Sequence, residues 1–81
     1  MKNAKTMFEE LDYTKIKEND NYILYKHKRT PIYIEFMSNL TKSVKHISCY
    51  FKYAMFKSNV YLTLEELQAI NKQVEELGWE K

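Results

Sequence analysis

The sequence has only one cysteine, one proline and one glycine among 81 residues. A single cysteine excludes an intramolecular disulfide and is typical of proteins in a reducing compartment. A single glycine leaves no glycine-rich loop that could hold a phosphate group. No apolar run approaches the roughly 18 residues of a membrane-spanning helix, and the polar N-terminus predicts no signal peptide. We therefore expect a cytoplasmic protein with no membrane partner, in which residues 1–81 form a single domain.

Arginine is also scarce, because Arg29 is the only arginine among 13 basic residues. The formal net charge is +2, but the charges are segregated along the chain. Residues 63–81 carry five glutamates against two lysines, whereas residues 26–57 carry one acid, Glu35. The cations of this middle segment are Lys26, Lys28, Arg29, Lys42, Lys45, Lys52 and Lys57. The sequence thus predicts a basic middle and an acidic C-terminal segment.

Residues 63–79 have the signals of a complete helix at both ends. Thr63 and Glu66 have the spacing of a capping box, in which each side chain binds a backbone N–H of the other residue. Gly78 can adopt the left-handed conformation of a helix C-cap, and Trp79 can then fold back on Val74. The apolar stripe that should face the rest of the protein is Leu67, Ile70, Val74 and Leu77.

A shorter N-terminal helix is predicted before residue 13. Asn3 or Thr6 can cap it, and Asp12 tolerates the positive φ that ends a helix. Tyr13 follows Asp12 as Trp79 follows Gly78, so we expect both helices to end with the same C-cap, a residue with positive φ followed by an aromatic residue. The apolar face of this helix is Ala4, Met7, Phe8 and Leu11.

The segment between the two helices alternates in the way that half-buried strands do. We expect strands at residues 22–27, 32–37 and 44–51, and a short fourth strand at 60–62. Residues 14–21 are polar and are read as a non-strand segment with a turn at 18–21. Residues 52–59 are left unassigned. Short links favour antiparallel pairing, so the predicted fold is α+β, α-β-β-β-(β)-α, with both helices on one face of the sheet.

Few residues could carry catalysis or bind a metal. His46 and Cys49 would point to opposite faces of a strand, and a structural zinc site needs four ligands. Cys49 could act as a nucleophile only if His27 or His46 lay beside it, and a buried thiol is the preferred interpretation. We therefore expect no metal, no cofactor and no enzymatic activity; a small hydrolase would require His27, His46 and Cys49 to converge.

The strongest candidate for a functional surface is the basic, aromatic middle of the chain. Cations can pair with phosphate and tyrosine rings can stack on bases, so this composition is typical of a nucleic-acid interface. An exposed tyrosine-rich sheet face is also typical of a protein interface. The predicted binding residues are Tyr25, Lys26, Lys28, Arg29, Tyr33, Lys45, Tyr50 and Lys52. A protein partner is the first hypothesis, nucleic acid the second, and a homodimer is a further expectation for so small a core.

The two ends of the chain resemble a group of phage proteins. The opening MFEEL-D-Y and the closing TLEELQAINKQVEELGW, around a variable middle rich in tyrosine and lysine, are similar to small uncharacterised proteins of phages and prophages in low-GC Gram-positive bacteria. The match covers residues 5–13 and 63–79 and departs at Asp12, where glycine is usual. The resemblance implies a phage accessory protein in the host cytoplasm. It also implies action by binding a host or phage protein, including inhibition of a defence or replication system.

Overall fold

The computed structural model describes residues 2–39, 41, 43–53, 56–59 and 61–79, and for residues 56–59 it describes the backbone. The chain forms helix α1 (Ala4–Glu10), strands β1 (Tyr13–Asn19), β2 (Tyr22–His27), β3 (Ile32–Ser38), β4 (Lys45–Tyr53) and β5 (Phe56–Asn59), and helix α2 (Leu64–Leu77). This order confirms the predicted α+β class, with one strand more than the sequence indicates.

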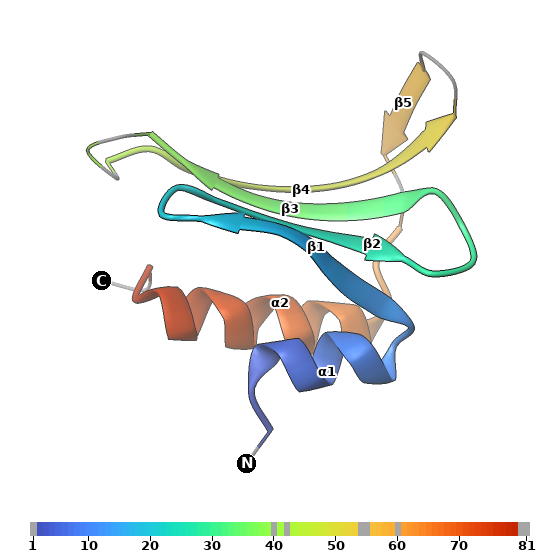
Figure 1. Cartoon of the computed structure of the whole chain (residues 1–81), viewed down its shortest axis with the longest axis horizontal. Helices are drawn as coiled ribbons and strands as arrows, with labels where there is room; N and C mark the ends of the chain where they lie inside the picture. Colours follow the sequence, from blue (N-terminus) through green and yellow to red (C-terminus); the bar gives the residue numbers. More distant parts are fainter. Residues whose placement is uncertain (1, 40, 42, 54–55, 60, 80–81) are drawn as a thin grey trace.

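The five strands form one antiparallel sheet in the order β1-β2-β3-β4-β5. Each strand pairs with its neighbour in sequence, because the connections between them are short. Helices α1 and α2 lie side by side against one face of the sheet, and no other element covers the opposite face in the described part of the chain (Figure 1). The predicted placement of both helices on the same face is therefore confirmed.

An aromatic cluster fills the space between the helices and the sheet. The ring of Phe8 from α1 stacks on Tyr25 of β2, with 3.9 Å between centroids. Tyr13 and Phe36 meet the same Phe8 ring edge-on, at 5.9 and 6.2 Å. All four side chains are almost completely buried, together with Ile34. Stacked and edge-to-face geometries are those that aromatic rings prefer. The cluster therefore buries apolar surface and also orients α1 relative to the sheet.

The helix caps predicted from the sequence are confirmed. Thr63 N donates to Glu66 Oε1 at 2.8 Å and Glu66 N donates to Thr63 Oγ1 at 3.1 Å, which completes the capping box. Gly78 has φ of +72°, and Trp79 N donates to Val74 O at 3.1 Å. At the first helix the N-cap is Asn3, which accepts from Thr6 N, and Asp12 has φ of +68°.

The face that α2 turns towards the sheet differs from the predicted stripe. Its buried residues are Ala69, Ile70 and Gln73, whereas Leu67 is 43% exposed and Val74 and Leu77 are half-buried. Gln73 can occupy the buried centre because its Oε1 accepts a hydrogen bond from the Tyr25 hydroxyl at 2.7 Å. The sequence pattern counted this glutamine as a solvent-facing residue, since its partner lies 48 positions away.

Apart from Tyr13, strand β1 lies in residues 14–21, for which the sequence predicts a polar segment without a strand. Only its first residue, Tyr13, is buried, so the apolar alternation that predicts strands is missing. Its backbone nevertheless pairs with β2 over its length, with a register shift at Ile16 between Lys15 and Lys17. Polar residues and a bulge are common on edge strands, because they disfavour pairing with another chain. Only residues 20–21 remain as the turn.

The last part of the sheet also differs from the expectation. β4 extends to Tyr53, and the final strand is Phe56–Asn59, within residues 52–59, for which the sequence pattern predicts no element. Of the predicted strand at 60–62, Val60 lies outside the described residues, and Tyr61 and Leu62 are exposed and not in a strand. On β4, the side chains of Cys49 and Phe51 are half-buried, but Ile47 is 43% exposed. The two helices therefore cover β4 only in part.

The side of α2 that faces the core can be tested with two substitutions. We expect Ile70→Ala to lower the free energy of unfolding by about 2–4 kcal/mol, because it opens a cavity in the core. Leu67→Ala removes a side chain that is already 43% exposed and should cost less than about 1 kcal/mol. Urea unfolding followed by circular dichroism measures both. Equal losses for the two variants would contradict the observed orientation of α2.

Candidate functional site

The uncovered face of the sheet is assembled from alternate residues of its strands. Residues paired across strands point to the same side, and Ile23, Tyr25, Ile34 and Phe36 point to the core. Their sequence neighbours therefore point away from the helices. We call this surface the outer face. Its residues form three rows across strands β1 to β4, which are Thr14–Lys26–Tyr33–Tyr50, Lys17–Leu24–Glu35–Ser48 and Asn19–Tyr22–Met37–His46. The alternation along β4 adds Lys52 to this face.

Tyrosine rings and lysine side chains contact one another across this face. The rings of Tyr33 and Tyr50 stack with 5.5 Å between centroids and 14° between planes. Lys26 Nζ lies 6.0 Å from the centroid of Tyr33, and Lys17 Nζ lies 5.9 Å from that of Tyr22. These distances are those of cation–π contacts, which hold the lysine side chains along the sheet surface.

A carboxylate lies in the middle of the outer face. Tyr22 donates its hydroxyl to Glu35 Oε2 at 2.7 Å, and Tyr50 donates to the same oxygen at 3.4 Å. Burial of the phenol and the neighbouring Glu35 raise the pKa of Tyr22, and the same causes raise the pKa of Tyr50 to about 12. Both hydroxyls therefore stay protonated at neutral pH and remain donors to the carboxylate.

Four of the predicted binding residues lie together on the outer face. Lys26, Tyr33 and Tyr50 belong to one cross-strand row, and Lys52 follows two residues after Tyr50 on β4. Tyr25 was wrongly predicted as a surface residue. It is fully buried, because it faces the helices, stacks on Phe8 and donates to Gln73.

The other three predicted residues lie elsewhere. Lys28 and Arg29 are in the turn between β2 and β3, where Arg29 Nη2 lies 3.5 Å from Asp12 Oδ2 at the end of α1. Lys45 pairs with Ser38, which places it on the helix side of the sheet. The predicted set is thus divided among the outer face, a turn and the opposite face.

The set of predicted binding residues omits four others that lie on the outer face, which are Lys17, Leu24, Glu35 and Met37. The alternation in residues 22–26 and 33–37 contains the signal for three of them, because each is adjacent to a core residue. Lys17 gave no such signal, since β1 lacks apolar alternation.

The two histidines and the cysteine do not converge. His46 is on the outer face opposite Met37, and Cys49 is on the helix side opposite Ile34. His27 lies on β2, two strands from Cys49, with its ring edge-on to Tyr13 at 5.1 Å. Burial, followed by the nearby Glu66, raises the pKa of the Cys49 thiol to about 11. Within the described residues, no three potential ligands form a cluster that could hold a metal ion.

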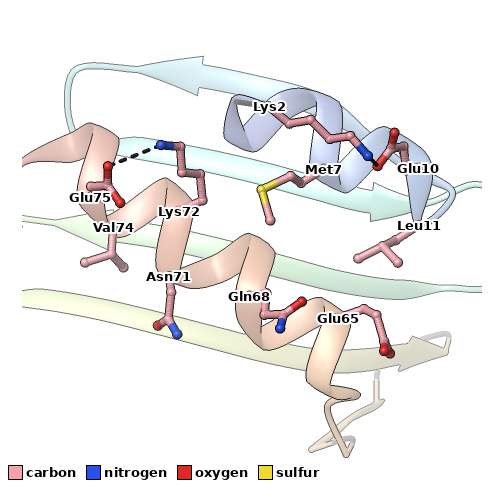
Figure 2. A pocket seen from close by; sticks show the side chains of 10 residues that line it. All are labelled: Lys2, Met7, Glu10, Leu11, Glu65, Gln68, Asn71, Lys72, Val74 and Glu75. Carbon is pink, nitrogen blue, oxygen red and sulfur yellow. Dashed lines mark hydrogen bonds and ion pairs between the residues drawn. The ribbon is translucent and has the colours of Figure 1, made fainter.

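A concave region lies between the two helices. It is an open groove of about 780 Å³, into which Met7 and Leu11 point from α1 (Figure 2). Two ion pairs lie along it, Lys2–Glu10 at 2.8 Å and Lys72–Glu75 at 3.2 Å. Because these charges are already paired within the chain, the groove has less unpaired charge to offer a ligand than the outer face has.

Comparison with protein-family models, with curated protein sequences and with solved structures finds no match to this chain. None of the helices in the described ranges is both long enough and apolar enough to cross a membrane.

The environment of Cys49 leads to a reactivity test. A thiol pKa of about 11 instead of 9 leaves roughly a hundredfold less thiolate at neutral pH, and the thiolate is the reactive form. Alkylation by iodoacetamide, followed by mass spectrometry, should therefore be at least about a hundredfold slower in the native protein than in denaturant. A native rate within tenfold of the denatured one would show that Cys49 is activated or accessible.

Proposed function

We propose that this protein is a non-enzymatic accessory protein of phage type that binds another protein through the outer face of its sheet. The single observation that carries the proposal is the composition of that face, where tyrosine, leucine and methionine lie among lysines. Neither helix of the described chain covers this face (Figure 1). Tyrosine and methionine are enriched in protein interfaces, and an uncovered patch of this kind usually marks one.

The charges of the outer face favour a partner whose surface is mainly acidic. Lys17, Lys26 and Lys52 surround one acid, Glu35, and the positive turn residues Lys28 and Arg29 are at one end of the sheet. Complementary charge increases the association rate and disfavours wrong partners more than it increases affinity. The partner is a host or phage protein, and binding inhibits its function in the host cytoplasm, as in inhibition of a defence or replication system.

Nucleic acid is the second candidate, and one observation favours it. Tyr33 and Tyr50 form a stacked pair beside Lys26, which resembles the aromatic platforms that bind single strands. Two features oppose it. Glu35 at the centre repels phosphate, and the rings of Tyr33 and Tyr50 stack on each other, so that less of their surface is free for bases.

The proposal is tested with a double substitution on the outer face, Lys26→Glu with Tyr33→Ala. Tagged protein is incubated with lysate of a low-GC Gram-positive host, and captured proteins are quantified by mass spectrometry. We expect the double variant to retain about tenfold less of the partner, because it removes an aromatic anchor and reverses a charge. Lys5→Glu, an exposed charge reversal on α1, is the matched control and should retain the partner.

Three outcomes contradict the proposal. The first is capture that is equal for the outer-face variant and the Lys5 control. The second is enrichment of nucleic acid alone, with steeply salt-dependent binding to a labelled single-stranded oligonucleotide. The third is a homodimer, detected by light scattering of the purified chain, that the double variant converts to monomer. In that case a second copy occupies the outer face.

A further inference from the structure

Among the described residues, none forms an ion pair with the carboxylate of Glu35. Glu35 lies at the middle of β3, the central strand of the sheet, and its side chain is partly buried between Tyr22 and Tyr50. The ion pairs among the described residues are formed by Glu10, Glu18, Asp12 and Glu75, and none involves Glu35. A carboxylate that is partly removed from water usually has a cationic partner, because desolvation disfavours the charged form.

The neighbouring lysines are held away from this carboxylate. Lys26 Nζ donates to the His27 carbonyl at 3.0 Å and lies against the ring of Tyr33. Lys17 lies against the ring of Tyr22. Each lysine is therefore engaged with a ring at the border of the outer face, and the centre remains negative.

The two oxygens of the carboxylate differ in their hydrogen bonds within the described chain. Both tyrosine hydroxyls donate to Oε2, and among the described residues no side chain donates to Oε1. The two tyrosines also place aromatic rings beside the carboxylate. A carboxylate oxygen that accepts no hydrogen bond from the described side chains, next to tyrosine rings, is a combination that binds cations by charge and by cation–π contact.

We propose that Glu35, Tyr22 and Tyr50 form a subsite for a cationic side chain of the protein partner, with arginine as the best occupant. A guanidinium group has its N–H donors in one plane, so it can donate to the Glu35 carboxylate beside the two tyrosine rings. The lysines at the border then pair with acidic residues around that arginine. The inference rests on the proposed function, and it adds the chemistry of the contact at the centre of the interface.

The experiment measures binding of a small arginine probe to the full chain by NMR. Acetyl-arginine amide is titrated into isotope-labelled protein, and acetyl-citrulline amide, which has the same shape without the charge, is the matched ligand control. We expect saturable shifts of the ring signals of Tyr22 and Tyr50 and of the Glu35 carboxylate, with a millimolar dissociation constant. Citrulline should give no saturable shift.

Two variants separate the subsite from general charge. Glu35→Gln keeps the shape and the tyrosine hydrogen bonds but removes the charge, and we expect it to weaken arginine binding about tenfold. Glu18→Gln removes a glutamate that pairs with Lys15 and lies opposite the core residue Ile23, and it should leave binding unchanged. Equal shifts with arginine and citrulline, or equal affinity of the Glu35→Gln variant, would overturn the inference.

The failure of this inference differs from the failure of the proposed function. If the outer-face double variant loses its partner but the arginine probe does not bind at Glu35, the interface stands and the subsite is wrong. If Glu35→Gln instead tightens binding of a single-stranded oligonucleotide, the carboxylate acts as a repulsive group on a nucleic-acid surface. That result overturns both the arginine subsite and the proposed protein-binding function.

Discussion

The stacking of Phe8 on Tyr25 is the contact on which the rest of this structure depends. It joins a residue of the first helix to a residue of β2, and Tyr13 and Phe36 complete the cluster edge-on. Through Gln73, the same Tyr25 also fixes the rotation of α2. A chain of 81 residues has a small core, so a few large rings supply much of its buried apolar surface. Both helices are therefore held on one side of the sheet.

The functional surface is a consequence of this one-sided core. Each strand that contributes a ring or an aliphatic side chain to the core presents its neighbouring residue to the other side. Five of the six tyrosines in the described strands are divided in this way: Tyr13 and Tyr25 are buried, whereas Tyr22, Tyr33 and Tyr50 lie on the outer face. Tyrosine therefore contributes both to the core and to the outer face, and the register of strand pairing sets the side on which each tyrosine lies.

Features that depend on neighbouring residues could be predicted from the sequence. The capping box at Thr63, the left-handed residues Asp12 and Gly78 and the alternation in β2 and β3 arise within a few positions of the chain. Features that depend on residues far apart in the chain could not be predicted from the sequence. β1 exists because β2 offers it backbone groups, and its own side chains carry almost no apolar signal. Four of the eight predicted binding residues lie on the outer face for a related reason: composition identifies cations and rings, but not their side of the sheet.

The class of the fold, both ends of α2, the C-terminal end of α1 and the basic, aromatic character of the middle segment could be predicted from the sequence, because these follow from local propensity and composition. Contacts between the elements set which side of α2 is buried, which tyrosines are exposed and where Glu35 lies relative to Tyr22 and Tyr50. Each of these depends on contacts between residues far apart in the chain, such as the 48 positions that separate Tyr25 from Gln73. The carboxylate at the centre of the outer face is one acid in a basic segment when read along the chain, and it acquires its position between two tyrosines only when three strands pair.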